Sequence, residues 1–190
     1  MNIVIFGPPG AGKGTQSNLI AKKFNLYQIS TGQLLRDEIN NNTLLGKKIS
    51  SIINNGNLVS DKIVGDLIEG YIKKKTYINR MIFDGYPRNL IQAKNLNIVL
   101  NKYNQKIHVV LKLSVSLETI KKRISERKAL ENRSDDSETI AIKRYENYEK
   151  NIAPVIEFYK RSNLLSVING EKSIAQINDE ISGLIDSTKG

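Results

Sequence analysis

Short apolar runs alternate with segments of helical spacing along the whole chain. Five runs, most of them rich in Ile, Val, Leu or Phe, span residues 2–6, 27–30, 81–84, 107–113 and 164–168. The first run is apolar on both faces, as a central parallel strand is. Between the runs, apolar residues recur at helical intervals and predict helices over 13–24, from about 33 to 39, and over 43–56, 61–75, 89–103, 117–127, from about 138 onward, and over 174–185. Strands that alternate with helices predict a three-layer α/β/α fold around a doubly wound, five-stranded parallel sheet.

Polar residues mark several of the expected boundaries. Thr31 occupies an N-cap position before the second helix, and Ser60 and Asp61 together form a cap before the fourth. The run Asn-Asn-Gly-Asn at 54–57 ends the third helix. The helical pattern stops between 128 and 134, and Pro154 is expected to kink or restart the long helix that follows.

The segment between the first strand and the first helix is rich in glycine. Residues 7–15 read Gly-Pro-Pro-Gly-Ala-Gly-Lys-Gly-Thr and fit the spacing G-x-x-x-x-G-K. Glycines lack the β-carbons that would keep backbone N–H groups from closing on an anion, and the helix start adds the positive end of a dipole. Lys13 is then placed to reach the β- and γ-phosphates, so the stretch predicts a nucleoside triphosphate site. Gly14 stands where Ser or Thr usually follows the lysine, with Thr15 one residue later.

A second group of candidate residues follows the next two strands. Asp84 ends the third predicted strand, and Gly-Tyr-Pro-Arg follows it through Arg88. Thr31 and Arg36 lie at the start of the helix after the second strand. Ligands of open α/β sheets bind at the carboxyl edge of the strands, where these residues are expected to meet. They predict a second anion pocket beside the first.

The chain is strongly basic, with a formal net charge of +10. Such a charge can bind nucleic acid, but most of the 29 basic residues are lysines spread along the predicted helices. Arginine binds phosphate through a planar two-point fork, so the few arginines mark candidate sites. They lie at 36, 80, 88, 123, 127, 133, 144 and 161. In-line phosphoryl transfer needs such charges around the transferring group and no protein nucleophile.

These motifs resemble those of adenylate kinases, within the nucleoside monophosphate kinases. They are GPPGAGKGTQ at 7–16, ISTGQLLR at 29–36, FDGYPRNLIQA at 83–93, RISER at 123–127, RSDD at 133–136 and Arg144. Together they cover nearly the whole chain in order. The resemblance implies reversible phosphoryl transfer from ATP to AMP, giving two ADP, with Mg²⁺ bound alongside ATP.

The resemblance also implies the site residues. For ATP they are Gly10, Ala11, Gly12, Lys13, Gly14, Thr15, Arg123, Arg127 and Lys172. For AMP they are Thr31, Arg36, Asn57, Leu58, Val59, Gly85, Tyr86, Pro87, Arg88, Gln92, Arg133 and Arg144. Catalytic roles are implied for Lys13, Arg88, Arg123, Arg133 and Arg144, and Asp84 would orient Mg²⁺ through water, which suits Gly14 in place of a metal-binding hydroxyl.

The same resemblance implies a single domain over 1–190, with an AMP-closing subdomain at about 30–59 and a short lid at about 127–133. The chain has no cysteine, so no zinc is expected in the lid. We expect a cytoplasmic monomer with ATP and AMP as substrates and neither nucleic acid nor membrane as partner. Residues before Gly7 are too few for a targeting peptide, and no apolar run approaches the roughly 18 residues of a membrane span.

Two alternatives stay open at this point. Asn89 stands where adenylate kinases usually have Thr, and uridylate/cytidylate kinases tend to have Asn there. Gln92, which would face the base, favours adenine, because the pyrimidine enzymes tend to have Asn at that place. The other alternative is a P-loop ATP-dependent module that binds nucleic acid.

Overall fold

The computed structural model describes residues 1–131 and 138–188. The strands in these ranges are β1 (Ile3–Phe6), β2 (Tyr27–Ser30), β3 (Met81–Asp84), β4 (Val109–Ser114) and β5 (Leu165–Asn169). The helices are α1 (Lys13–Phe24), α2 (Thr31–Asn40), α3 (Leu44–Asn54), α4 (Asp61–Ile72), α5 (Leu90–Lys102), α6 (Leu117–Glu131), α7 (Glu138–Lys160) and α8 (Ile174–Ser187), with a 3-10 turn η1 (Lys75–Tyr77). The strands are all parallel, in the order β2-β3-β1-β4-β5. The predicted five-stranded parallel sheet is therefore confirmed.

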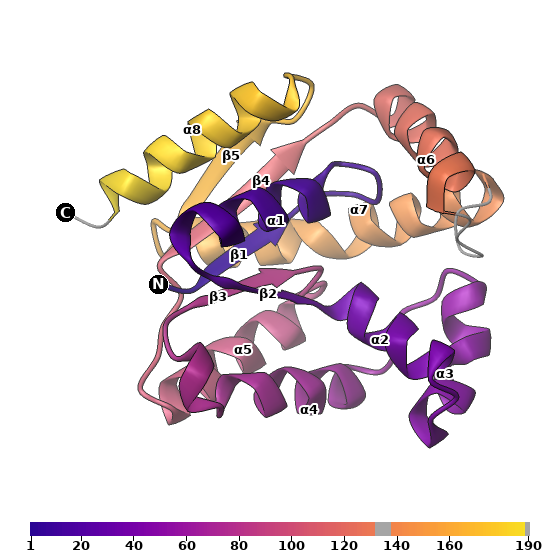
Figure 1. Ribbon diagram of the computed structural model, residues 1–190, viewed down its shortest axis with the longest axis horizontal. Coiled ribbons are helices and arrows are strands. Elements are labelled where there is room, and N and C mark those ends of the chain that lie inside the picture. Colours follow the sequence, from indigo (N-terminus) through magenta and orange to yellow (C-terminus); the bar gives the residue numbers. More distant parts are fainter. Residues whose placement is uncertain (132–137, 189–190) are drawn as a thin grey trace.

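Alternate residues of β1 belong to two separate cores, one on each face of the sheet. Ile3 and Ile5 pack with residues of α1 and α8, whereas Val4 and Phe6 pack with residues of α4, α5 and α7. Figure 1 shows α8 on one side of the sheet and α4 and α5 on the other. Burying one such side chain stabilises the fold by about 1.5–3 kcal/mol, so β1 anchors both outer layers. This is the predicted three-layer arrangement.

The carboxyl ends of the strands meet at one edge of the sheet. Ser30 at the end of β2 pairs in register with Asp84 at the end of β3, and Ile5 of β1 also pairs with Asp84. The arrowheads of β1 and β4 point toward the side of the molecule where α2, α3 and α6 lie (Figure 1). Residues that follow the strands are thus gathered between these helices.

The two predicted N-caps differ from the structure in their details. Ser30, not Thr31, is the N-cap of α2, and its hydroxyl accepts a hydrogen bond from the Gln33 N–H at 3.4 Å. Thr31 already belongs to the helix. Ser60 is the N-cap of α4 as predicted, but its side chain makes no capping hydrogen bond.

Several helix boundaries also differ from the prediction by one to four residues. Helix α4 ends at Ile72, a few residues before the predicted 75, and α6 continues past Arg127 to Glu131. Helix α7 runs through Pro154 as one helix, so of the two expected outcomes the restart is wrong and the kink stays a prediction. In the ranges that the structure describes, no helix has both the length and the apolar composition needed to cross a membrane.

Candidate active site

Two cavities open at the carboxyl edge of the sheet and share part of their walls. The smaller has a volume of about 120 Å³, and the larger is a cleft of about 890 Å³. The shared wall contains four of the predicted cationic residues, Lys13, Arg36, Arg88 and Arg144. A ligand in either cavity would therefore meet the same positive charges.

The glycine-rich loop forms one end of the larger cleft, which Gly10 to Thr15 all line. Gly10 and Gly12 have φ values of 81° and 89°, a backbone conformation that favours glycine. A β-carbon at Gly10 would also lie only 3.0 Å from Cγ1 of Ile124 on α6. The loop leads directly into α1 at Lys13, so the N-terminal dipole of that helix faces the cleft.

Lys13 is folded back onto the loop that carries it. Its Nζ donates hydrogen bonds to the carbonyl oxygens of Gly7 at 2.7 Å and Pro8 at 2.9 Å. Burial lowers the Lys13 pKa from 10.5 to about 8; the negative charge of Asp84 opposes this fall, and the positive charges of Arg88, Arg144 and Arg127 add to it. Several cations therefore converge on one place, which is favourable only when an anion joins them.

The arginines reach this place from separate elements. Arg36 comes from α2, Arg123 and Arg127 from α6, Arg144 from α7, and Arg88 from the loop after β3. Two of them are held by backbone carbonyls: Nη2 of Arg123 donates to Gly170 O at 2.9 Å, and Nε of Arg88 donates to Gly85 O at 2.8 Å. Such bonds orient a guanidinium toward the cleft that it lines.

Asp84 is the carboxylate beside the phosphate loop. It is buried and lines the larger cleft, and its Oδ2 accepts a hydrogen bond from Gln28 Nε2 at 3.0 Å. A β-carbon built on Gly14 would lie 3.8 Å from the same oxygen, so Gly14 brings the helix start close to the carboxylate. A carboxylate beside Gly14, which carries no hydroxyl, fits a Mg²⁺ ion that is held by phosphates and reached through water. The described residues contain no group of three or more His, Cys, Asp or Glu side chains that could bind a metal by themselves.

The smaller cavity contains most of the residues implied for AMP. Its lining includes Asn57, Leu58 and Val59 from the segment after α3, together with Gly85, Pro87 and Arg88 from the loop after β3. Helix α7 adds Arg144, and the amide of Asn147 donates to Gly56 O at 3.2 Å. The cavity is thus closed by α7 on one side and by the α2–α3 segment on the other.

Three residues implied for AMP lie behind this wall and line neither cavity: Thr31, Tyr86 and Gln92. Thr31 is buried, and its hydroxyl donates to Gly85 O at 2.9 Å. Tyr86 packs into the core between the sheet and its helices. Gln92 is also buried, and its Oε1 accepts a hydrogen bond from the Arg88 backbone N–H at 2.7 Å.

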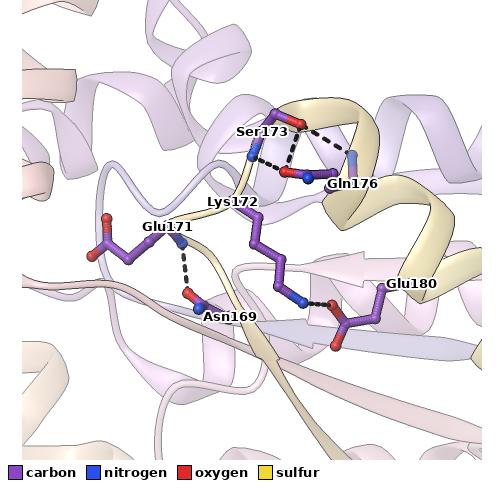
Figure 2. Close-up of polar contacts among 6 residues, drawn as sticks. All are labelled: Asn169, Glu171, Lys172, Ser173, Gln176 and Glu180. Carbon is purple, nitrogen blue, oxygen red and sulfur yellow. Dashed lines mark hydrogen bonds and ion pairs between the residues drawn. The ribbon is translucent and has the colours of Figure 1, made fainter.

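The last two implied residues stand apart from these groups. Lys172 lines the larger cleft after β5, and its Nζ is paired with Glu180 Oε2 at 2.7 Å. Figure 2 shows the lysine extended along the start of α8 toward that carboxylate. Arg133 lies outside the described residues, as do the last two positions of the predicted lid, whereas 127–131 belong to α6.

Sequence reasoning missed four residues of this region. Gln28 binds Asp84, Asp61 binds Gln92 Nε2 at 2.8 Å, and Asn147 and Tyr148 of α7 line the smaller cavity. Gln28 lies in a predicted strand whose end faces the site, which is a signal that could have found it. Asp61 was predicted only as part of a cap, and the sequence carries no sign that its partner lies 31 residues away.

Known proteins resemble this chain over nearly its whole length. The family model described as "Adenylate kinase" matches residues 5–164. The chain is 41% identical to the adenylate kinase of Pelagibacter ubique, over 97% of this chain and 99% of that protein. It is 36% identical to the adenylate kinase of Methanothrix thermoacetophila and 35% identical to that of Petrotoga mobilis, each aligned over at least 97% of both chains.

Proposed function

The chain belongs to the adenylate kinase family, and from that premise we propose how its site transfers a phosphoryl group from ATP to AMP to give two ADP. The prediction of an adenylate kinase enzyme is confirmed by the full-length relatives. The same relatives weigh against a pyrimidine nucleotide kinase and against a nucleic-acid-binding module. What remains to be proposed is which residues do the work.

One observation carries the proposal: cations from distant parts of the chain converge on Lys13. Among the described residues, the charges that act on Lys13 are those of Arg88, Arg144 and Arg127 and the carboxylate of Asp84. The larger cleft holds the ATP phosphates on the N–H groups of 10–15, and Arg123 and Arg127 lie along its wall. AMP occupies the smaller cavity with its phosphate at the shared wall of Arg36, Arg88 and Arg144. The two phosphates then meet at the shared wall.

Transfer at this place needs positioning and charge more than covalent help. An oxygen of the AMP phosphate is itself the nucleophile, so no protein base has to remove a proton. Lys13 exchanges its two carbonyl partners for phosphate oxygens and moves with the transferring group. Arg88, Arg123, Arg144 and Arg133, the last of which lies outside the described residues, stabilise the charge that spreads over that group.

Magnesium fits beside Asp84, which we propose to orient it through water. The ion would neutralise part of the charge on the ATP phosphates. Gln28 holds Oδ2 of Asp84 as an acceptor, so the carboxylate can receive hydrogen bonds from metal-bound water.

The remaining assignments follow the family. Gln92 recognises the adenine of AMP, Thr31 and Tyr86 support the pocket from behind, and Lys172 lies near the ATP base. Residues of about 30–59 close over AMP and about 127–133 over ATP, which keeps water from accepting the phosphoryl group. We further propose a cytoplasmic monomer that binds neither nucleic acid nor membranes.

An acceptor panel tests the proposal. The purified protein is incubated with Mg-ATP and one of AMP, GMP, UMP or CMP, and formation of the diphosphate is followed. AMP should exceed the others by orders of magnitude in kcat/KM, because a site built for the adenine edge leaves its polar groups unpaired with other bases. Equal use of UMP or CMP would instead support a pyrimidine kinase, and light scattering of the same sample reports whether the protein is a monomer.

A further inference from the structure

The N-termini of α4 and α5 share a network of three polar side chains behind the smaller cavity. Asp61 is the first residue of α4, Asn89 is the N-cap of α5, and Gln92 lies in the first turn of α5. Gln92 Nε2 donates to Asp61 Oδ1 at 2.8 Å. Asn89 Nδ2 donates to both Asp61 oxygens, at 2.9 and 3.2 Å, and its own oxygen accepts from the Gln92 backbone N–H at 2.8 Å.

This network fixes which way round the Gln92 amide lies. A carboxylate can only accept and a backbone N–H can only donate, so the amide nitrogen must face Asp61 and the amide oxygen must face Arg88. The reverse orientation would place two acceptors 2.8 Å apart and two donors 2.7 Å apart. Gln92 is 2% exposed, so no bulk water is at hand to relieve that conflict.

The Gln92 amide has two N–H groups and two oxygen lone pairs. Among the described residues, Asp61 accepts from one N–H and the Arg88 N–H occupies one lone pair, so one N–H and one lone pair remain for a base. Adenine presents an acceptor at N1 and a donor at its 6-amino group, and this pair matches a glutamine amide. Guanine presents a donor at N1 and an acceptor at O6, so it would need the amide to be turned round. The same amide could read either purine if nothing held it.

We propose that Asp61 is a positioning residue that sets the purine specificity of the acceptor site: by holding the Gln92 amide in one orientation, it admits adenine and rejects guanine. This inference rests on the proposed role of Gln92 in recognising the base. Asn89 belongs to the same network. Its amide nitrogen donates to both carboxylate oxygens of Asp61, and its amide oxygen accepts from the Gln92 backbone N–H at the start of α5. The two helix N-termini that meet here also favour a carboxylate at this place.

Asp61→Asn is the direct test, since it keeps the shape and lets the side chain both donate and accept. The reverse orientation of Gln92 then loses its conflict at residue 61 and keeps only the donor–donor conflict with the Arg88 backbone N–H, so it becomes less unfavourable. KM for AMP should therefore rise by about tenfold, and the AMP-to-GMP ratio of kcat/KM should fall by at least about tenfold. The KM for ATP and the kcat at saturating AMP should stay near those of the wild type. Asp66→Asn is the matched control, because Asp66 lies on the same helix and pairs only with exposed Lys62, and it should change none of these values.

A double-mutant cycle separates positioning from a merely structural role. In a Gln92→Ala background, Asp61→Asn should change the AMP-to-GMP ratio no further, because the amide on which it acts has gone. The inference would be overturned if Asp61→Asn left the AMP-to-GMP ratio of kcat/KM unchanged. It would also be overturned if Asp61→Asn lowered this ratio equally in the wild-type and Gln92→Ala backgrounds. If Gln92→Ala itself left the preference for AMP unchanged, the proposed role of Gln92 would fail first, and this inference would fail with it.

A measurement on the wild type does not depend on any variant folding. Inosine monophosphate has the N1–H and the 6-oxo group of guanine but lacks its 2-amino group. A locked amide should reject inosine monophosphate as strongly as GMP, whereas a site that excludes GMP by the bulk of the 2-amino group would accept it. Turnover of inosine monophosphate close to that of AMP would therefore refute the lock.

Discussion

Replacing Lys13 by methionine tests both the catalytic role of the ammonium group and its effect on the stability of the fold. Lys13 is half-buried among cations, and its pKa falls from 10.5 to about 8, with desolvation as the largest cause. Methionine has a similar length and carries no proton. The variant should fold, and its turnover should fall at least about a hundredfold, because the ammonium stabilises the transferring phosphoryl group more than the bound substrates.

The stability of the two proteins should differ in a pH-dependent way. Below pH 8 the lysine is protonated in both the folded and the unfolded chain, so the folded state bears the full cost of burying the charge. Between the folded pKa of about 8 and the unfolded value of 10.5 the unfolded chain binds more protons, and the stability of the wild type rises with pH. A shift of this size corresponds to about 3 kcal/mol. Relative to Lys13→Met, the wild type should gain about 2–3 kcal/mol between pH 7 and pH 10.

Urea unfolding of both proteins at a series of pH values measures this gain. Other groups titrate in the same range, but they are common to both chains, so the difference between the two free energies of unfolding isolates Lys13. If the free energies of unfolding of the two proteins changed in parallel from pH 7 to pH 10, the pKa of Lys13 would not be lowered in the folded protein. Near-normal turnover of Lys13→Met would contradict its catalytic role independently.

Three further predictions concern the subdomains and the lid. Gly46→Ala should destabilise the protein by at least about 2 kcal/mol and raise KM for AMP, because the added β-carbon would overlap the backbone carbonyl of Glu38 in α2. Gly70→Ala is the control: open space surrounds this position, so the change should stabilise α4 by about 0.5–1 kcal/mol. Amide exchange should slow over 30–59 and 127–133 when a ligand of two adenosines joined by a pentaphosphate binds, and unchanged protection would contradict closure. Arg133→Lys should lower kcat by about 10- to 1000-fold, because lysine lacks the planar guanidinium that binds phosphate at two points. The surface control Lys102→Ala should leave kcat unchanged. If Arg133→Lys had the same kcat and KM as the wild type, Arg133 would have no role in the mechanism.

The strands and the phosphate loop could be predicted because their signals are local. β1 is a continuous apolar run, and the glycines and Lys13 follow it within a few residues. The family resemblance rests on such stretches, and the matched family model confirms it. The end of α6 was missed because apolar spacing marks only the buried face of a helix. Beyond Arg127 the chain continues with residues of good helix propensity, such as Lys128 and Leu130, and the helix continues to Glu131.

Interactions between distant residues could not be predicted in the same way. Thr31 looks like a cap in sequence, yet Ser30 performs that role because the chain turns into α2 one residue earlier. Asp61 reads as a capping residue, and only the packing of α4 against α5 reveals that it binds two side chains 28 and 31 residues away. The geometry around Gln92 likewise depends on the backbone of Arg88, which no sequence pattern specifies.

Phosphate binding can be predicted from one stretch of sequence and catalysis cannot, because the two functions depend on differently distributed residues. Anion binding is sequence-local, because consecutive N–H groups of 10–15 and one helix dipole suffice to attract phosphate. Catalysis is not local: burial by the surrounding fold is the largest cause of the lowered Lys13 pKa, and the charges of Arg88, Arg144 and Arg127 add to it from three other places in the fold. Repulsion between these like charges lowers the stability of the fold, and bound phosphates would offset that repulsion. Nucleotide binding should therefore stabilise this chain more than contact area alone would suggest, because it also removes a conflict that folding creates.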